Sequence, residues 1–449
     1  YFQAETDRLA ADSLADVKTL EDWNARKDRY RREMHEMLGL DPAPKRTPLK
    51  ATVTGKLDHE DFEVWKLHYQ SIPRLYVTAN LYIPKGLKKP APAILYVCGH
   101  GKVKKDGVSY GNKVHYQHHG IWFARHGYVC LTIDTLQLGE IEGIHHGTYN
   151  HDMWWWNSRG YSSASVEAWN SIRALDYLET LDFVDKNRFG VTGRSGGGAY
   201  SWWISVLDER IKVSAPVAGI TSLKNHVYAG FQNSGRLAHG VVEGHCDSMF
   251  HVNTYRWDFD HIAALVAPRP LMILNTDDDR IFPLDGVTDV FNGVRRIYDL
   301  HGQRNKLGLT IVPGGHSDTQ PLQVPAFNWF NRHLKGEEGP ITVAAVKLFE
   351  PEQLKVFNEL PADSINADIQ ETFTQLADDK SKPSQKTVEL LRAKTFRGWP
   401  AKENSLNAKR AFSTEYEGVV FEAIDFDSQE HIRLRAYIAY RKGLEKPSR

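Results

Sequence analysis

A serine flanked by glycines, lying between a predicted strand and a predicted helix, constrains this chain more than any other feature. The run Phe189-Gly190-Val191-Thr192 is typical of a short buried strand, and Gly193-Arg194-Ser195-Gly196-Gly197 follows it directly. A helix of small and aromatic residues then begins at Gly196. Gly-x-Ser-x-Gly at such a junction is a nucleophile elbow, because the sharp turn leaves almost no room for side chains beside the serine. The helix behind it directs free N–H groups and the positive end of its dipole toward the serine.

The rest of the chain alternates short apolar runs with helical patterns. Six runs have the character of parallel strands buried on both faces: 93–97, 128–133, 188–192, 213–217, 271–275 and 309–312. Helices are expected at 165–180, 286–300 and 325–334, an antiparallel pair at 62–69 and 76–83, and a helical segment at 4–40. This order predicts an α/β fold with a mostly parallel, doubly wound sheet and helices on both faces.

Length and charge bound the organisation and the partners. At 449 residues the chain has room for one large domain and a second segment. We expect a tag remnant at 1–3, an N-terminal helical segment at 4–60, a catalytic domain at 61–345 and a C-terminal α+β segment at 346–449. Fifty-six Lys and Arg residues balance 56 Asp and Glu residues, so no nucleic-acid partner is expected. No apolar run approaches the roughly 20 residues that span a bilayer.

The end of the C-terminal segment resembles the first strand pair. A second strand pair is expected at 419–426 and 432–440, and the stretch 433–444 is similar to 75–87. Each stretch is followed within three residues by a Lys-Pro pair. Two interpretations are open. The segment is either the start of a second module like the first, or an unrelated edge hairpin with similar propensities.

A serine nucleophile needs an acid and a histidine after later strands. The strand at 271–275 runs into Asp277, Asp278 and Asp279, where the carboxyl end of a parallel strand would present a carboxylate. Asp279 is preferred because the chain must turn there before the next helix, and the other two stay open. After the strand at 309–312, a glycine pair presents His316 just before the closing helix. We predict that His316 exchanges a proton with Ser195 and that Asp279 orients its ring.

Two backbone N–H groups are needed to hold the oxyanion that forms during acyl transfer. One is expected from Gly196, directly after the nucleophile. The other is expected from the turn after the strand at 93–97, where Cys98-Gly99-His100-Gly101 follows, and His100 and Gly101 are the two candidates. His100 could instead cap this loop.

Several polar and aromatic residues are candidates for substrate binding. The aromatic run Trp154-Trp155-Trp156 has rings that suit the faces of sugars, although a lid packed on the core would look the same. Arg194 lies in the elbow, and His245 and Tyr255 lie in a polar insertion between strands, where specificity is commonly determined. His245, Cys246 and Asp247 do not match a zinc-binding pattern, so neither a metal nor an organic cofactor is expected.

These segments resemble the bacterial α/β-hydrolases of the acetyl xylan esterase, dienelactone hydrolase and prolyl oligopeptidase-like group. The likeness is carried by the elbow, 208–212, 264–271, 279–283 and 314–316, within about residues 60–340. It implies an α/β-hydrolase fold and hydrolysis of carboxylic esters, often on plant polysaccharides, by exported enzymes. One position departs from the pattern. Glucuronoyl esterases carry Arg after the nucleophile and acetyl xylan esterases carry Gln, whereas Gly196 stands here.

The sequence therefore predicts a serine esterase that deacylates a carbohydrate through an acyl-Ser195 intermediate. A prolyl oligopeptidase-like peptidase is a second hypothesis, but the roughly 60 residues before the catalytic domain are too few for the gating module that such enzymes need. A carbohydrate-binding protein with a retired triad is the third. Export is expected from the family likeness, and a tag at 1–3 would have replaced any natural signal peptide, so the sequence carries no direct evidence on the compartment.

Overall fold

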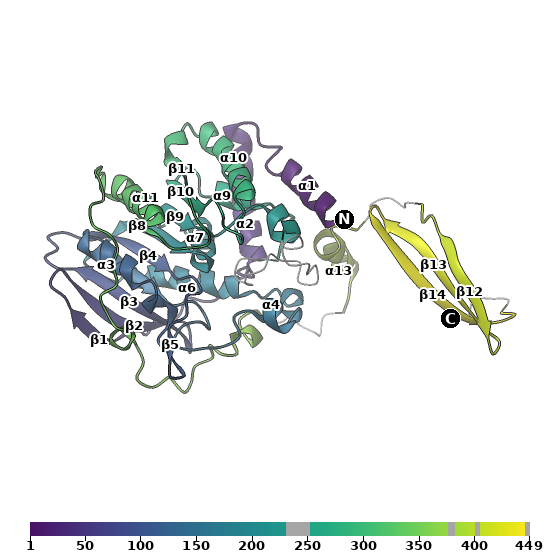
Figure 1. Cartoon of the computed structure of the whole chain (residues 1–449), viewed down its shortest axis with the longest axis horizontal. Helices are drawn as coiled ribbons and strands as arrows, with labels where there is room; N and C mark the ends of the chain where they lie inside the picture. The colour runs from purple at the N-terminus through teal and green to yellow at the C-terminus, as the bar shows by residue number, and fades with distance from the viewer. Residues whose placement is uncertain (230–251, 376–381, 400–404, 445–449) are drawn as a thin grey trace. The chain divides into compact units, whose positions relative to one another are not determined.

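The computed structural model describes residues 1–229, 252–375, 382–399 and 405–444. The chain divides into two compact units (Figure 1). The main unit runs from Arg8 to Asp378, and the second unit comprises Tyr1–Asp7 with Asp379–Arg449. The predicted segment 346–449 is divided between the two units, and from here on only residues 379–449 are called the C-terminal segment.

A nine-stranded sheet forms the centre of the main unit, in the order β1-β2-β3-β7-β4-β8-β9-β10-β11. β1, β2 and β3 form an antiparallel meander, and β3 pairs antiparallel with β7. All later neighbours are parallel. The bounds are β1 Thr52–Asp58, β2 Phe62–Ile72, β3 Leu75–Pro84, β4 Ala91–Val97, β7 Val129–Ile133, β8 Val184–Arg194, β9 Ile211–Val217, β10 Leu271–Thr276 and β11 Leu307–Val312. A small hairpin lies outside this sheet. Its two strands, β5 (Lys104–Lys105) and β6 (Val108–Ser109), have two residues each.

Helices cover both faces of the sheet, as Figure 1 shows. One face packs against α3 (Gln117–Arg125) and α11 (Gln320–Phe330), and the other packs against α6 (Ser163–Leu178), α7 (Gly196–Leu207) and α10 (Leu284–Leu300). Successive strand residues point to opposite faces. In β4, Ile94 and Tyr96 pack on the face covered by α3 and α11. Leu95 and Val97 pack on the face covered by α6, α7 and α10. This is why the strands are apolar throughout.

The α/β fold and the mostly parallel sheet predicted from the sequence are confirmed. The expected helical segment at 4–40 is interrupted. α1 spans Phe2–Asp12, and α2 spans Leu20–Met37. Thr19 explains the restart, because its side chain accepts the N–H of Asp22 while the Asp22 carboxylate accepts the N–H of Thr19. β1 was not predicted; its residues are mostly exposed, so it lacks the apolar run that marks the other strands.

The main unit extends past residue 345, the predicted end of the catalytic domain. Leu354, Val356 and Phe357 are buried, and the Glu140 carboxylate accepts the N–H groups of Val356 (2.7 Å) and Phe357 (2.8 Å). These contacts hold the chain at residues 354–357 against the rest of the main unit. Apolar side chains at irregular spacing do not identify such a strap in a sequence.

The C-terminal segment holds α13 (Gln385–Leu390), a helical turn at Leu391–Thr395 and an antiparallel sheet. Its strands are β12 (Lys409–Tyr416), β13 (Val419–Gln429) and β14 (Ile432–Arg441), which we call the C-terminal sheet. None of the described helices has both the length and the apolar character needed to cross a bilayer.

Candidate active site

Ser195 occupies the sharp turn between β8, which ends at Arg194, and α7, which begins at Gly196. Its backbone lies at φ 61° and ψ −122°, a conformation that non-glycine residues rarely adopt. A Cβ on Gly193 would lie 2.2 Å from the carbonyl oxygen of Val97, and one on Gly197 would lie 2.1 Å from the same oxygen. Both flanking glycines are therefore required by the backbone of the neighbouring strand.

His316 connects Ser195 to Asp279. Its Nε2 lies 2.9 Å from the Ser195 Oγ, and its Nδ1 lies 2.7 Å from the Asp279 Oδ2. Asp279 follows β10 and His316 follows β11, so three side chains far apart in the chain meet at the carboxyl edge of the sheet. The side chain of Asp279 is 1% exposed and that of His316 is 21% exposed, which keeps the carboxylate away from water while the ring stays accessible.

The neighbouring acids, Asp277 and Asp278, hold the turn that carries His316. The Asp277 carboxylate accepts the N–H of Gly314 at 2.9 Å, and the Asp278 N–H donates to the Gly314 carbonyl at 3.1 Å. Gly314 adopts φ 128°, which glycine tolerates best. Of the three acids left open by the sequence, Asp279 is thus the one bonded to the imidazole.

The surroundings of Asp279 favour its ionised form. Burial alone would raise the pKa of this carboxyl. The hydrogen bond from His316 and the N–H groups of Phe282 (3.1 Å) and Ile281 (2.9 Å) outweigh burial and hold the pKa of Asp279 below its ordinary value. The carboxylate can therefore stabilise a proton on the imidazole.

The loop after β4 packs against the elbow. Thr135 donates its hydroxyl to the Cys98 carbonyl at 2.8 Å, and Asn112 donates its amide to the Gly99 carbonyl at 2.6 Å. A Cβ on Gly196 would lie 2.4 Å from the His100 Nε2, so the His100 ring lies directly over the residue after the nucleophile. This contact leaves no room for a side chain at residue 196.

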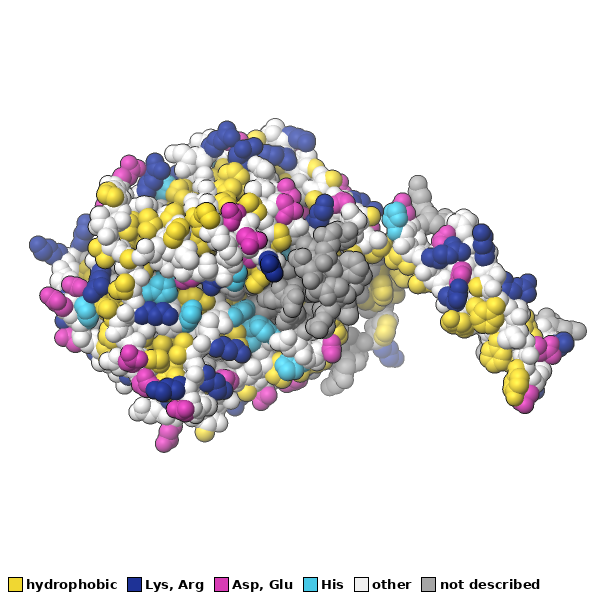
Figure 2. All heavy atoms as spheres, in the orientation of Figure 1, with side chains coloured by type: hydrophobic (Ala, Val, Ile, Leu, Met, Phe, Trp, Pro, Cys, Tyr) yellow, Lys and Arg dark blue, Asp and Glu magenta, His cyan; other side chains and the backbone are white. Residues whose placement is uncertain are grey.

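Three imidazoles lie together beside the elbow. The ring centres of His100, His145 and His146 are 4.7–5.2 Å apart, and the Tyr200 hydroxyl lies 3.4 Å from the His145 Nε2. Burial lowers the pKa of His100 to about 3 and that of His146 to about 4, with nearby cationic groups adding to the effect. Burial also holds the pKa of His145 well below its usual range. The cluster therefore offers neutral hydrogen-bonding groups next to Ser195. Figure 2 shows histidine side chains at the surface along the middle of the main unit.

The residues proposed for substrate binding have different surroundings. Trp156 is fully buried and packs edge-on against Tyr161 at 4.8 Å, so it belongs to the core and cannot stack on a sugar. Trp154 is 45% exposed, and Trp155 is partly buried. The Tyr255 hydroxyl donates to Glu36 at 2.6 Å, which ties it to α2.

Two further candidates complete that set. Arg194 is partly buried, and its carbonyl lies against Gly99. His245 lies outside the described residues, as do Cys246 and Asp247 of the same insertion.

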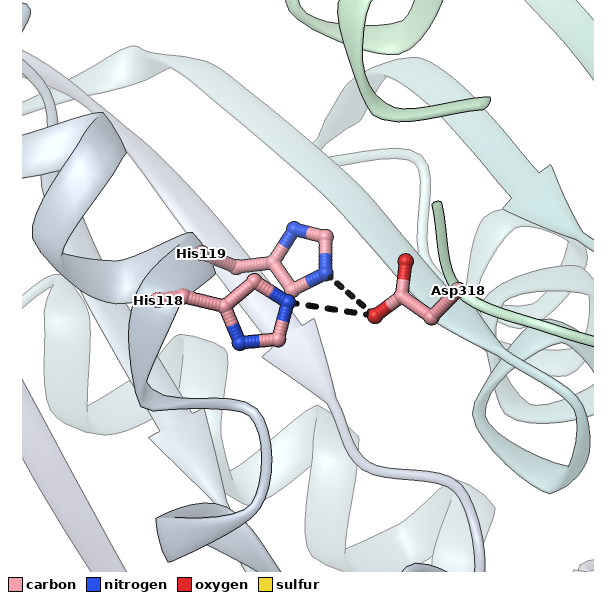
Figure 3. Close-up of side chains that lie close together, drawn as sticks. All are labelled: His118, His119 and Asp318. Atoms are coloured by element: carbon pink, nitrogen blue, oxygen red, sulfur yellow. Dashed lines mark hydrogen bonds and ion pairs between the residues drawn. The ribbon is translucent and has the colours of Figure 1, made fainter. Parts of the chain in front are cut away.

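A second cluster, not identified from the sequence, anchors the loop of His316. Figure 3 shows His118 and His119 on α3 with both rings directed at Asp318, two residues after His316. The Asp318 Oδ2 lies 2.9 Å from the His119 Nε2 and 3.2 Å from the His118 Nε2, and Gln323 donates to its Oδ1 at 3.1 Å. Burial opposes the charge on Asp318, but the two imidazoles outweigh it and keep the pKa of Asp318 low.

In the described part of the chain, this cluster is the group of His, Cys, Asp or Glu side chains whose potential ligand atoms lie close enough together to share a metal ion. Its Asp318 oxygen already accepts from both rings, which anchors the loop of His316 to α3. The adjacent histidines in the sequence were the available signal. Their partner is 199 residues away, which a single sequence does not reveal.

The fold and the site agree with a known family model. Residues 9–309 match the model described as the Abhydrolase family. The chain belongs to this family. The match covers the elbow, β10 and Asp279, and it ends just before His316.

Named relatives and solved structures of this Abhydrolase family member include esterases. YtaP of Bacillus subtilis (strain 168), a hydrolase by name, is 24% identical over 310 residues, covering 68% of this chain and 98% of the relative. The 4-O-methyl-glucuronoyl methylesterase of Phanerochaete carnosa (strain HHB-10118-sp) is 25% identical over 244 residues, covering 48% and 58%. Methylesterase BT1017 has a similar structure, with TM-score 0.61, 21% identity and coverage of 81% and 77%. An acetyl xylan esterase from Paenibacillus sp. R4 has TM-score 0.50, 16% identity and coverage of 69% and 95%.

Proposed function

We propose that this chain is a serine carboxylic ester hydrolase that deacylates a carbohydrate, with acetyl as the preferred acyl group. The observation that supports it most strongly is the single imidazole of His316, within hydrogen-bond distance of both Ser195 and Asp279. An alcohol, a base and an orienting carboxylate in this order are the groups that acyl transfer needs.

In the proposed reaction, Ser195 Oγ attacks the ester carbonyl as His316 Nε2 takes the hydroxyl proton. The N–H of Gly196 and that of His100 or Gly101 would hold the oxyanion. Collapse of the tetrahedral intermediate breaks the bond to the sugar oxygen, which leaves with the proton from His316. Water then attacks the acyl-serine, gives a proton to His316, and releases the carboxylic acid as Ser195 recovers its proton.

The surroundings of the elbow support a small, uncharged acyl group. The His100 ring covers Gly196, so a neutral imidazole lies over the residue after the nucleophile. The half-exposed Trp154 would offer an aromatic face for the sugar. A polymeric substrate of this kind is met outside the cell, and for this reason export is part of the proposal.

A methyl ester of a uronic acid is the second candidate. The names of the Phanerochaete carnosa relative and of methylesterase BT1017 favour it. In that case the sugar would be the acyl part and methanol the leaving group. Gly196 argues against it, since glucuronoyl esterases resemble this chain but carry an arginine there.

The test is hydrolysis of acetylated xylan, p-nitrophenyl acetate, a methyl glucuronate and a proline anilide by the wild type, Ser195→Ala and Ser158→Ala. Ser158 is an exposed serine bonded to the Trp155 carbonyl and serves as the matched control. We expect acetyl esters to be cleaved fastest, a loss of about 10⁴-fold or more in Ser195→Ala, and no change in Ser158→Ala. Faster cleavage of the methyl ester or the anilide would replace the acetyl esterase by a methylesterase or a peptidase.

A further inference from the structure

The C-terminal sheet repeats the opening meander of the main unit pair by pair. Every residue partnership of β1 with β2 recurs between β12 and β13, and every partnership of β2 with β3 recurs between β13 and β14. Each counterpart lies 357 positions further along the chain. For example, Asp58 faces Glu63 in the first meander, and their counterparts Glu415 and Val420 face each other in the second. Strand length alone does not impose a common register, because a hairpin can pair in several registers.

The irregularities recur at the same offset. Each meander interrupts its second ladder at a serine, Ser71 in the first and Ser428 in the second. Each interrupts its first ladder between the positions of Val53 and Gly55, which correspond to Arg410 and Phe412. Bulges are specific features of a fold. Their coincidence therefore points to a true repeat.

The backbone outside the ladders agrees as well. Positive φ angles occur at Lys50 and Asn407 (45° and 43°) and at Arg74 and His431 (69° and 63°). The hydrogen bond from the N–H of Gln70 to the Leu49 carbonyl (2.7 Å) recurs from Asp427 to Leu406 (2.8 Å). The sequence Lys-Gly-Leu follows the last strand in both meanders.

The preceding helices begin in the same way. Thr19 caps α2 and Ser384 caps α13, each through a reciprocal pair of side-chain and backbone hydrogen bonds with the residue three positions later. Thr19 lies 33 residues before the first strand, whereas Ser384 lies 25 residues before its counterpart, so the common offset applies to the sheet alone.

Burial is where the two meanders differ. Val77 and Leu81 of β3 are 3% and 0% exposed, whereas their counterparts Leu434 and Ile438 are 47% and 42% exposed. Figure 2 shows hydrophobic side chains at the surface of the C-terminal sheet. In the main unit, β7 pairs with β3 at Ala79–Tyr82, and α3 and α6 pack on the meander. Among the described residues, β14 has β13 as its one neighbour.

We infer that residues 384–444 are the opening of a second α/β-hydrolase module, and that two parts of the C-terminal sheet bind the remaining core of that module: the apolar face around Leu434 and Ile438, and the outer edge of β14. The occupant is a parallel sheet with its helices, carried by polypeptide that follows residue 449. The β3–β7 interface of the main unit is the pattern for this contact. An apolar face and an unpaired edge of this kind are unfavourable in water unless they are covered.

The test begins with the genomic DNA beyond the codon for Arg449. We expect the reading frame to continue into an apolar strand and then, at about 110 residues after Gly443, into a second strand–Gly-x-Ser-x-Gly–helix junction, the spacing that separates Gly86 from Ser195. A stop codon before that point, or a continuation without such a junction, would overturn the inference.

The protein expressed to its natural stop codon then tests the contact itself. Hydrogen exchange of the amides at 436–439 should be at least 100-fold slower in the longer protein than in the 449-residue chain, because the edge strand gains a partner. Equal exchange in both proteins would contradict the inferred pairing.

A pair of matched substitutions tests the apolar face. Ile438→Lys replaces the counterpart of buried Leu81, and Ser413→Lys replaces the counterpart of exposed Lys56. In the longer protein, Ile438→Lys should lower Tm by about 5 °C or more and Ser413→Lys should not. In the 449-residue chain neither substitution should shift Tm. Equal effects of Ile438→Lys in both proteins would refute a covered face.

Discussion

Replacing Asp279 by asparagine tests the orientation of the imidazole. In the wild type, Oδ1 accepts the N–H groups of Ile281 and Phe282, and Oδ2 faces the His316 Nδ1. An asparagine must keep its oxygen on those two N–H groups, so its NH₂ would face His316 and act as a donor. The ring would then accept at Nδ1 and carry its proton on Nε2, toward Ser195. In that tautomer it cannot take the serine proton.

We therefore expect Asp279→Asn to lower kcat/KM by about 10⁴-fold, or about 5 kcal/mol in the transition state, with KM little changed. The assay is hydrolysis of p-nitrophenyl acetate, with melting curves to verify the fold. Asp277→Asn is the matched control, since an amide oxygen can still accept the Gly314 N–H, and it should stay within about threefold of the wild type. Retention of a tenth or more of the activity by Asp279→Asn, with a large loss in Asp277→Asn, would refute this orientation.

Three further substitutions test the surroundings of the site. Gly196→Ala should displace the partly buried His100 ring, lowering kcat/KM by about 10- to 100-fold and stability by about 1–3 kcal/mol; unchanged kinetics would contradict the close contact. Asp318→Asn should weaken the anchor of the His316 loop, with a lower kcat, an unchanged KM and about 2 kcal/mol less stability in denaturant titrations; an unaltered kcat would remove its positioning role. Burial raises the pKa of Glu167 to about 8, whereas the unfolded carboxyl ionises near 4.5, so the contribution of Glu167 to stability should fall as pH rises from about 4.5 to 8. Glu167→Gln should lack this slope, and parallel stability curves would contradict the raised pKa.

The parallel sheet could be predicted from the sequence because strands buried on both faces are apolar at every position. The elbow could be predicted because its glycines are required locally, by the Val97 carbonyl beside Gly193 and Gly197. The choice among three consecutive acids could only be argued from turn geometry, because it depends on which carboxylate the distant His316 ring meets.

Other features depend on contacts between distant parts of the chain. Trp156 looked suited to sugar binding, but its position in the core follows from packing against Tyr161 rather than from its own run of tryptophans. The Asp318 anchor joins segments 199 residues apart. The likeness of 75–87 to 433–444 was visible in the sequence, whereas the shared register and bulges needed the backbone.

The central claim is that Ser195, activated by His316, forms the acyl intermediate. The most direct measurement is mass spectrometry of the intact protein, quenched in acid during turnover of p-nitrophenyl acetate, followed by peptide mapping. The proposed mechanism predicts one added acetyl group per chain, located on Ser195, and none in Ser195→Ala or His316→Ala. Turnover at the wild-type rate by Ser195→Ala, or an acetyl group mapped to another residue that exchanges as fast as the reaction, would contradict the proposed mechanism.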